Sequence, residues 1–127
     1  DLQFIIDQDP QNAQALNALG YMLADHGQEL PRARELIEAA LSLRPGDPAI
    51  RDSLGWVLFR VGEVDSARQW LSEAYADFPD PEIAAHLGEV LWVLGEREQA
   101  LQIWDEARQR DPGNATLKNT VERLTQP

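Results

Sequence analysis

The sequence predicts an all-α fold, a solenoid of antiparallel helical hairpins, and three observations support this prediction. One skeleton of residues recurs three times, and the copies start 35 and then 33 residues apart. Within each copy a glycine separates two stretches with the apolar spacing of a helix. Prolines fall at the edges of these stretches, where helices begin or end. Self-similarity at such a period is typical of solenoids, whose units bury their apolar faces only against neighbouring units.

The repeated skeleton consists of a Leu-Gly pair, then Leu, Gly, Ala, a large hydrophobic residue, Ala and Pro at matching offsets. The first copy contains Leu19, Gly20, Leu23, Gly27, Ala33, Ile37, Ala40 and Pro45. The second contains Leu54, Gly55, Leu58, Gly62, Ala67, Leu71, Ala74 and Pro79, and the third Leu87, Gly88, Leu91, Gly95, Ala100, Trp104, Ala107 and Pro112. Functional residues of such a protein are expected on a surface rather than in a catalytic pocket.

The chain divides into five segments. Residues 1–12 read as the second helix of a truncated preceding repeat with its turn, 13–47, 48–80 and 81–114 as three full repeats, and 115–127 as a capping helix. The pattern predicts first helices at 13–26, 48–61 and 81–94, and second helices at 31–44, 64–77 and 97–110. A polar last helix would shield the apolar end of the solenoid from water.

The turns and helix crossings have a local explanation. Pro48 and Pro81 suit the first position of a helix, and Asp47 and Asp80 before them can cap it. Asn114 is the expected cap of the last helix. The glycines of the Leu-Gly pairs are expected where paired helices cross, because small side chains let the two backbones approach.

Composition excludes several kinds of function. Acidic residues outnumber basic ones 22 to 11, and a net charge of −11 opposes binding to nucleic acid or to anionic lipid. The chain has no cysteine, and its two histidines, His26 and His86, lack a neighbouring His or Cys that would suggest a metal site. No apolar run approaches the roughly 20 residues of a membrane span. We expect no enzyme activity, no cofactor, no metal and no direct membrane insertion by this chain.

The eight-slot skeleton over residues 13–112 resembles the tetratricopeptide repeat. The first aromatic slot of that repeat departs from the pattern, because Leu16, Arg51 and Ala84 occupy it here. The resemblance implies a right-handed superhelix whose first helices line a concave groove. Such grooves hold a peptide or helix of another protein, so the resemblance implies a non-catalytic scaffold or adaptor.

The amino-acid sequence of the second and third repeats, around residues 52–60 and 84–92, also resembles that of tetratricopeptide lipoproteins of the proteobacterial cell envelope. Some of these resemble adaptors that bring substrates to a periplasmic C-terminal-processing protease. The resemblance implies a periplasmic protein, anchored to the outer membrane through a lipid signal upstream of Asp1. The start at Asp1, without methionine, suggests a fragment of a longer protein.

In the tetratricopeptide repeat, positions two, five, nine and twelve of each first helix face the groove. Among the residues at or beside these positions, we expect the partner-binding groove to consist of Asn17, Tyr21, Asp52, Trp56, Phe59, Glu82, Glu89 and Trp92. Aromatic side chains are enriched among residues that dominate interface energy. The acidic residues would favour a partner with basic and apolar side chains. The alternative is that the rings pack between adjacent first helices and complete the core.

Two further interpretations concern other partners. Family members that clamp the C-terminal carboxylate of chaperones use Lys, Asn and Arg, whereas the matching positions here hold Asn17, Tyr21, Ser53, Glu82 and His86, so chaperone-tail binding is not expected. A structural, self-associating role is the main alternative to the adaptor. In that version the chain forms homo-oligomers, and Trp70 with the N-terminal residues Leu2, Phe4 and Ile6 supplies the contact.

Overall fold

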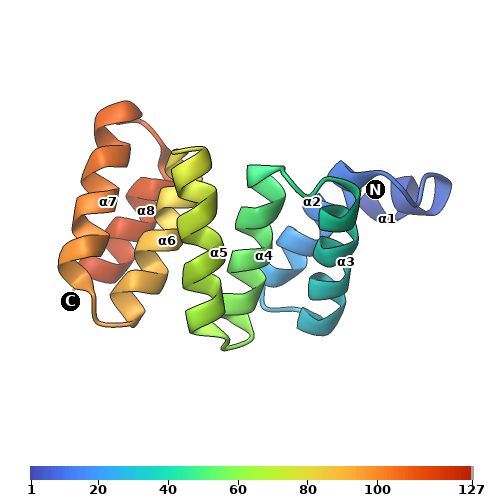
Figure 1. Ribbon diagram of the computed structural model, residues 1–127, viewed down its shortest axis with the longest axis horizontal. Helices are drawn as coiled ribbons and strands as arrows, with labels where there is room; N and C mark the ends of the chain where they lie inside the picture. The colour runs from blue at the N-terminus through green and yellow to red at the C-terminus, as the bar shows by residue number, and fades with distance from the viewer. Residues whose placement is uncertain (127) are drawn as a thin grey trace.

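The computed structural model describes residues 1–126, and these form helices joined by short turns, as the all-α prediction required (Figure 1). The helices are α1 (Leu2–Gln8), α2 (Ala13–Asp25), α3 (Leu30–Leu43), α4 (Pro48–Arg60), α5 (Val64–Asp77), α6 (Pro81–Val93), α7 (Arg97–Arg110) and α8 (Ala115–Thr125). The ends of α2 to α7 lie within one residue of the predicted ends. Three hairpins, α2–α3, α4–α5 and α6–α7, follow one another along the chain.

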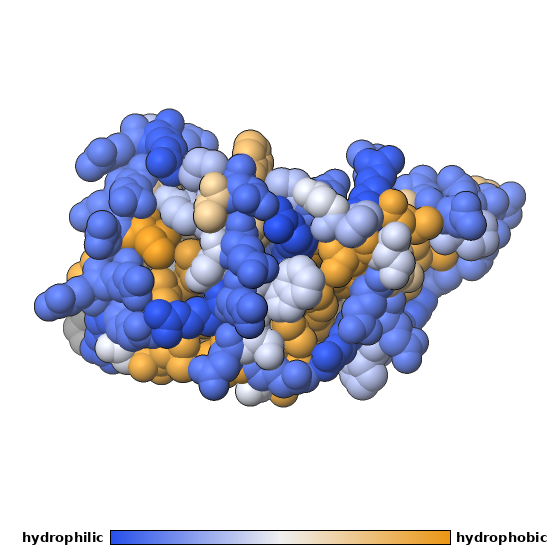
Figure 2. All heavy atoms as spheres, viewed as in Figure 1, coloured by the Kyte–Doolittle hydropathy of each residue, from blue (hydrophilic) through white to orange (hydrophobic). Residues whose placement is uncertain are grey.

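The hairpins stack so that their helices form two layers (Figure 1). The first helices α2, α4 and α6 contact one another in succession, and α8 continues this layer against α6. The second helices α3 and α5 each pack on their own first helix and on the first helix of the next hairpin, and α7 packs on α6 and on α8. Figure 2 shows hydrophilic residues along the outer helices α5 and α7, with hydrophobic residues in the furrows between them. The core lies between the two layers. The layer formed by α2, α4, α6 and α8, called the inner layer below, carries the candidate site.

The turns form because particular residues satisfy the free ends of the helices. One carboxylate oxygen of Asp47 accepts from the backbone N–H of Ala49 at 2.9 Å, and Asp80 accepts likewise from Glu82 at 2.9 Å. Each hairpin turn contains a glycine in the left-handed region, where other residues are strained, with φ of 67°, 92° and 88° at Gly27, Gly62 and Gly95. These two devices fix where the layers turn.

The repeated small residues lie where the paired helices cross. A Cβ atom placed on Gly55 of α4 would lie 2.6 Å from Cγ of Leu71 in α5, a distance that side chains do not tolerate. Gly20 stands in the same relation to Ile37, at 2.6 Å. Leu71 and Ile37 are both fully buried. The close crossing of each hairpin therefore depends on a glycine in the first helix.

The two ends of the solenoid differ. The short helix α1 packs on α2, while α8 covers both α6 and α7 and buries Leu117 and Thr120. Within residues 1–126, no helix is long and apolar enough to cross a membrane.

Candidate functional site

The inner layer contains a hollow of about 190 Å³ that all three first helices line. Each helix contributes two polar side chains to its lining, and two alanines complete it. The lining residues are Asn17, Ala18 and Tyr21 of α2, Ala49, Asp52 and Ser53 of α4, and Glu82 and His86 of α6. Four of the groove residues predicted from the sequence, Asn17, Tyr21, Asp52 and Glu82, meet here.

A buried histidine forms the centre of the site. His86 is 5% exposed, and its Nδ1 lies 2.9 Å from Oδ1 of Asp52. Its Nε2 lies 3.1 Å from the hydroxyl oxygen of Tyr21. In the neutral tautomer with a proton on Nδ1, the imidazole donates to Asp52 and accepts from Tyr21; as an imidazolium it donates to both. One side chain thus joins α2, α4 and α6.

The surroundings of His86 are negative. Burial lowers the pKa of His86. The charge and hydrogen bond of Asp52, with smaller effects of Glu89 and Asp25, raise this pKa by more than burial lowers it, so the pKa of His86 lies above its ordinary value. Burial also raises the pKa of Tyr21, and the charges of Asp25, Asp52 and Glu82 raise it more. The Tyr21 hydroxyl therefore keeps its proton, and the site has a negative potential.

Trp56 occupies a different environment from the exposed groove anchor that the sequence suggested. Its side chain is 5% exposed, and its ring stacks on the imidazole of His86 with 4.3 Å between centroids. The indole N–H donates to Oδ1 of Asp25 at 3.2 Å, and Phe59 packs 5.3 Å from the ring. The neighbouring first helices lie close enough to enclose the indole. Trp56 therefore packs between adjacent first helices, as the alternative interpretation had it, and is not an accessible anchor.

Two of the predicted groove residues, Glu89 and Trp92, contact α8 and α7 respectively. The carboxylate of Glu89 is 8% exposed and pairs with Arg123 of α8 at 2.5 Å. Trp92 is half-buried, 5.7 Å from the fully buried ring of Trp104, and the guanidinium of Arg97 lies 4.5 Å from its centroid. Neither Glu89 nor Trp92 lines the hollow. Of the predicted groove residues, four therefore line the hollow, Trp56 and Phe59 pack beside it, and Glu89 and Trp92 contact α8 and α7.

Sequence reasoning did not single out His86 as the centre of the site. It sits one position after Ala85, a groove-facing position of the third repeat, and that extra residue turns it towards the preceding first helix. The sequence did place its two hydrogen-bond partners, Tyr21 and Asp52, at groove positions of the two preceding repeats. Within residues 1–126, no group of three or more His, Cys, Asp or Glu side chains could hold a metal ion.

The residues proposed for self-association are spread over the molecule. Leu2 and Ile6 of α1 are half-buried against the core, whereas Phe4 is 62% exposed. Ile5, which was not in the predicted set, is 41% exposed. Trp70 on α5 is half-buried and packs on the core. The structure therefore exposes Phe4 and Ile5 of α1, but it does not join Trp70 to them.

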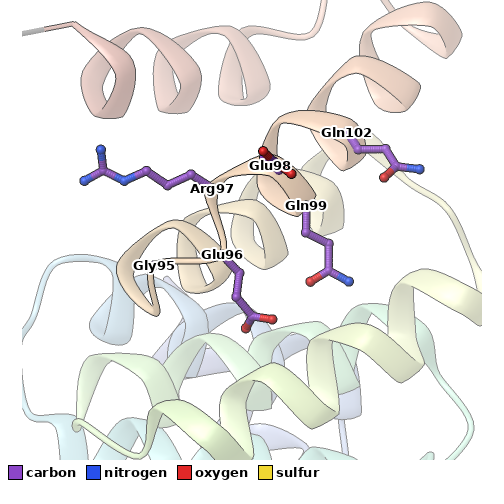
Figure 3. Close-up of a pocket in the computed structure, with 6 residues that line it drawn as sticks. All are labelled: Gly95, Glu96, Arg97, Glu98, Gln99 and Gln102. Carbon is purple, nitrogen blue, oxygen red and sulfur yellow. The ribbon is translucent and has the colours of Figure 1, made fainter.

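A larger hollow lies elsewhere, at the turn between α6 and α7. It has a volume of about 540 Å³ and is lined by Gly95, Glu96, Arg97, Glu98, Gln99 and Gln102. Figure 3 shows these side chains pointing away from one another, rather than converging on one point. Glu96 is engaged by Arg68 at 2.5 Å. We therefore take the hollow on the inner layer as the candidate site.

Comparison with known proteins identifies the repeat. Models of the tetratricopeptide repeat match residues 27–89, 1–48 and 81–106. The TPR repeat-containing protein PA4667 of Pseudomonas aeruginosa is 51% identical over 86 residues, which make up 68% of this chain and 15% of that protein. The chain thus spans a small part of the length of this curated relative.

Solved structures share the fold at low sequence identity. The thermophilic TPR protein TTC0263 of Thermus thermophilus superposes with a TM-score of 0.81 at 21% identity, over 97% of this chain and 69% of that one. The first TPR of Spaghetti (RPAP3), bound to the HSP90 peptide SRMEEVD, superposes with a TM-score of 0.72 at 18% identity, over 93% and 94%. The matched repeats and the two-layer solenoid together show that the chain belongs to the tetratricopeptide repeat family of non-catalytic interaction modules.

Proposed function

We propose that this chain is an adaptor or scaffold module that binds a segment of another protein along α2, α4 and α6, and that the segment carries basic and apolar side chains. The observation that supports this most directly is the hollow on the inner layer, which all three first helices line and which holds the carboxylates of Asp52 and Glu82. Contact with three helices would let one extended segment be held by residues from successive repeats.

The charges around the hollow support a basic partner. Asp52 pairs with His86, and Glu89 pairs with Arg123. Asp25 accepts a hydrogen bond from the neutral indole of Trp56, and Glu82 accepts one from the neutral hydroxyl of Thr116. The partners of Asp25 and Glu82 are therefore neutral groups, and within residues 1–126 no ion pair offsets these two carboxylates. Complementary charge gives specificity and speeds association, and a basic segment would supply it.

The apolar part of the proposed partner would meet the partly exposed rings of the same face. Tyr21, Phe59 and Trp92 are half-buried, with part of each ring open to solvent. Rigid aromatic rings bury large areas at small entropic cost on binding. The combination of open rings with free carboxylates favours a segment in which apolar residues alternate with Lys or Arg.

A displayed library of short random peptides, selected on the immobilised chain, tests this proposal. We expect enrichment of peptides with Lys or Arg beside apolar residues. Fluorescence anisotropy of a labelled selected peptide should then show about tenfold weaker binding to the Glu82→Lys variant, since a like charge would face the peptide. Glu73→Lys, the same change on the outer helix α5, is the matched control and should bind as the parent does. Selection of acidic peptides, or equal loss in both variants, would refute the proposal.

For the whole protein we propose the narrower role that the second and third repeats suggest. It would deliver clients to a periplasmic C-terminal-processing protease, anchored to the outer membrane through an upstream lipid signal. The support is the resemblance of residues 52–60 and 84–92 to envelope lipoproteins of that kind. Retention of a purified protease of this class by the immobilised chain, with loss in Glu82→Lys, would be expected; equal retention by both proteins would contradict this role.

A second candidate function is self-association through α1. Phe4 and Ile5 are exposed, and Ile5 with Leu2 lines a further hollow of about 270 Å³ against α2. If α1 joins copies of the chain, sedimentation velocity should show a dimer whose fraction increases with protein concentration. The Phe4→Asp substitution should abolish this dimer. A monomer at all concentrations would exclude this candidate.

A further inference from the structure

The hollow between α2, α4 and α6 contains hydrogen-bond acceptors that lack matching donors. Oδ1 of Asn17 is buried, and within residues 1–126 nothing donates to it. Both carboxylate oxygens of Asp52 share the single Nδ1 of His86, at 2.9 and 3.2 Å. The carboxylate of Glu82 receives one long bond, 3.3 Å, from Thr116. A carboxylate can accept about four hydrogen bonds, so Asp52 and Glu82 both have capacity left.

Two donors of the hollow, the hydroxyls of Ser53 and Tyr21, are already in use. The hydroxyl of Ser53 donates to the carbonyl of Ala49 at 3.1 Å, and the hydroxyl of Tyr21 is engaged with Nε2 of His86. The lining residues include neither Lys nor Arg. Besides the side-chain amide of Asn17, an occupant of the hollow would therefore find acceptors and negative charge, which suit a group with several N–H donors and a positive charge.

From this arrangement we infer that the hollow holds one cationic group of the bound segment, the guanidinium of Arg or the ammonium of Lys, between Asn17, Asp52 and Glu82. This inference rests on the proposed function and assigns a place and a chemistry to one anchor of the partner. Arg matches the site better, because its five N–H donors can reach the amide and both carboxylates at once.

The size of the hollow agrees with a single side chain. Its volume of about 190 Å³ is below the roughly 300–1,000 Å³ of pockets that take whole small molecules. Ala18 and Ala49 leave room for the aliphatic stem, which would lie against the ring of Tyr21. Bound in this way, the cation would lie beside Asn17, whose buried Oδ1 lacks a donor within residues 1–126.

The experiment uses small probes, so that it does not depend on finding the natural partner. The ¹⁵N-labelled chain is titrated with N-acetyl-arginine amide, N-acetyl-lysine amide, glycine amide and the uncharged isostere N-acetyl-citrulline amide. We expect the arginine probe to shift the side-chain amide of Asn17 and the backbone amides of Tyr21, Asp52 and Ser53, with weaker effects of the lysine probe. Glycine amide separates an N-terminal ammonium from a side-chain cation, and a stronger response to it would overturn the assignment to Lys or Arg.

Two matched variants complete the test. Glu82→Gln removes one charge from an exposed position of the hollow and should weaken the arginine probe about fivefold or more, while Glu73→Gln on the outer helix α5 should leave it unchanged. The inference fails if citrulline binds as well as arginine, or if the shifts lie outside the hollow. That failure is separate from failure of the proposed function, because the selected peptides could still bind along α2, α4 and α6 without a cation in the hollow.

Discussion

Gly55→Leu is expected to unfold the middle hairpin and to lower the free energy of unfolding of the whole solenoid by more than about 3 kcal/mol. Gly55 faces Leu71 where α4 and α5 cross, and even a Cβ atom there would lie 2.6 Å from the Leu71 Cγ. Overpacking a well-packed core typically costs about 1–3 kcal/mol, and a whole Leu side chain at this crossing is expected to exceed that range. Because each hairpin of a solenoid is stabilised mainly by its neighbours, loss of the middle one exposes the apolar faces of the other two.

The check is urea unfolding followed by circular dichroism at 222 nm. Gly55→Ala should give an intermediate loss of about 1–3 kcal/mol. Gly46→Ala is the matched control, since a Cβ at Gly46 meets nothing within 4 Å, and it should unfold as the parent does. A Gly55→Leu variant with the stability of the parent would show that the two helices do not cross as closely as the structure has them.

His86→Ala is expected to destabilise the chain by about 3–5 kcal/mol. The substitution leaves the carboxylate of Asp52, 8% exposed, without its buried partner, and breaking a buried pair has this effect. It also removes the stacking surface of Trp56 and the hydrogen bond of Tyr21. His26→Ala, at the exposed end of α2, is the control and should cost no more than about 1 kcal/mol. Equal losses in the two variants would contradict a central role for His86.

The contribution of His86 should depend on pH. Its pKa is raised in the folded state above the value of about 6.5 of the unfolded chain. Below that value both states carry the proton, and the stabilising effect is fully present; as pH rises towards the folded pKa, the folded state binds more protons than the unfolded state, and stability falls. Urea unfolding at about pH 6 and about pH 8.5 should therefore show the difference between parent and His86→Ala shrink as pH rises. A difference that grows with pH would reverse the sign of this account.

Local rules explain why the fold could be predicted from the sequence. The glycines of the hairpin turns, the prolines at helix starts and the caps Asp47 and Asp80 act within a few residues of their own positions, so each leaves a readable mark. The Leu-Gly pairs could be placed at helix crossings because the same spacing recurs in three copies. Each of these features arises from contacts within one hairpin or the turn that precedes it.

The site could be predicted only in part, because it joins residues of three repeats. Asn17, Tyr21, Asp52 and Glu82 were found because groove positions recur with the period. The burial of Trp56 and the centring of the network on His86 depend on how closely α2, α4 and α6 approach, and no single repeat encodes that distance. The ion pair of Glu89 with Arg123 likewise requires α8 to close over α6.

The central claim is that a partner segment lies on the inner layer of the solenoid. The most direct measurement is the chemical-shift map of the ¹⁵N-labelled chain saturated with a peptide selected from the displayed library. The account predicts that the largest shifts fall on α2, α4 and α6, at Asn17, Tyr21, Asp52 and Glu82, with the indole N–H of Trp56 responding through Asp25. Shifts concentrated on α3, α5 and α7, or on Phe4 and Ile5 of α1, would contradict it and would place the binding surface elsewhere on the molecule.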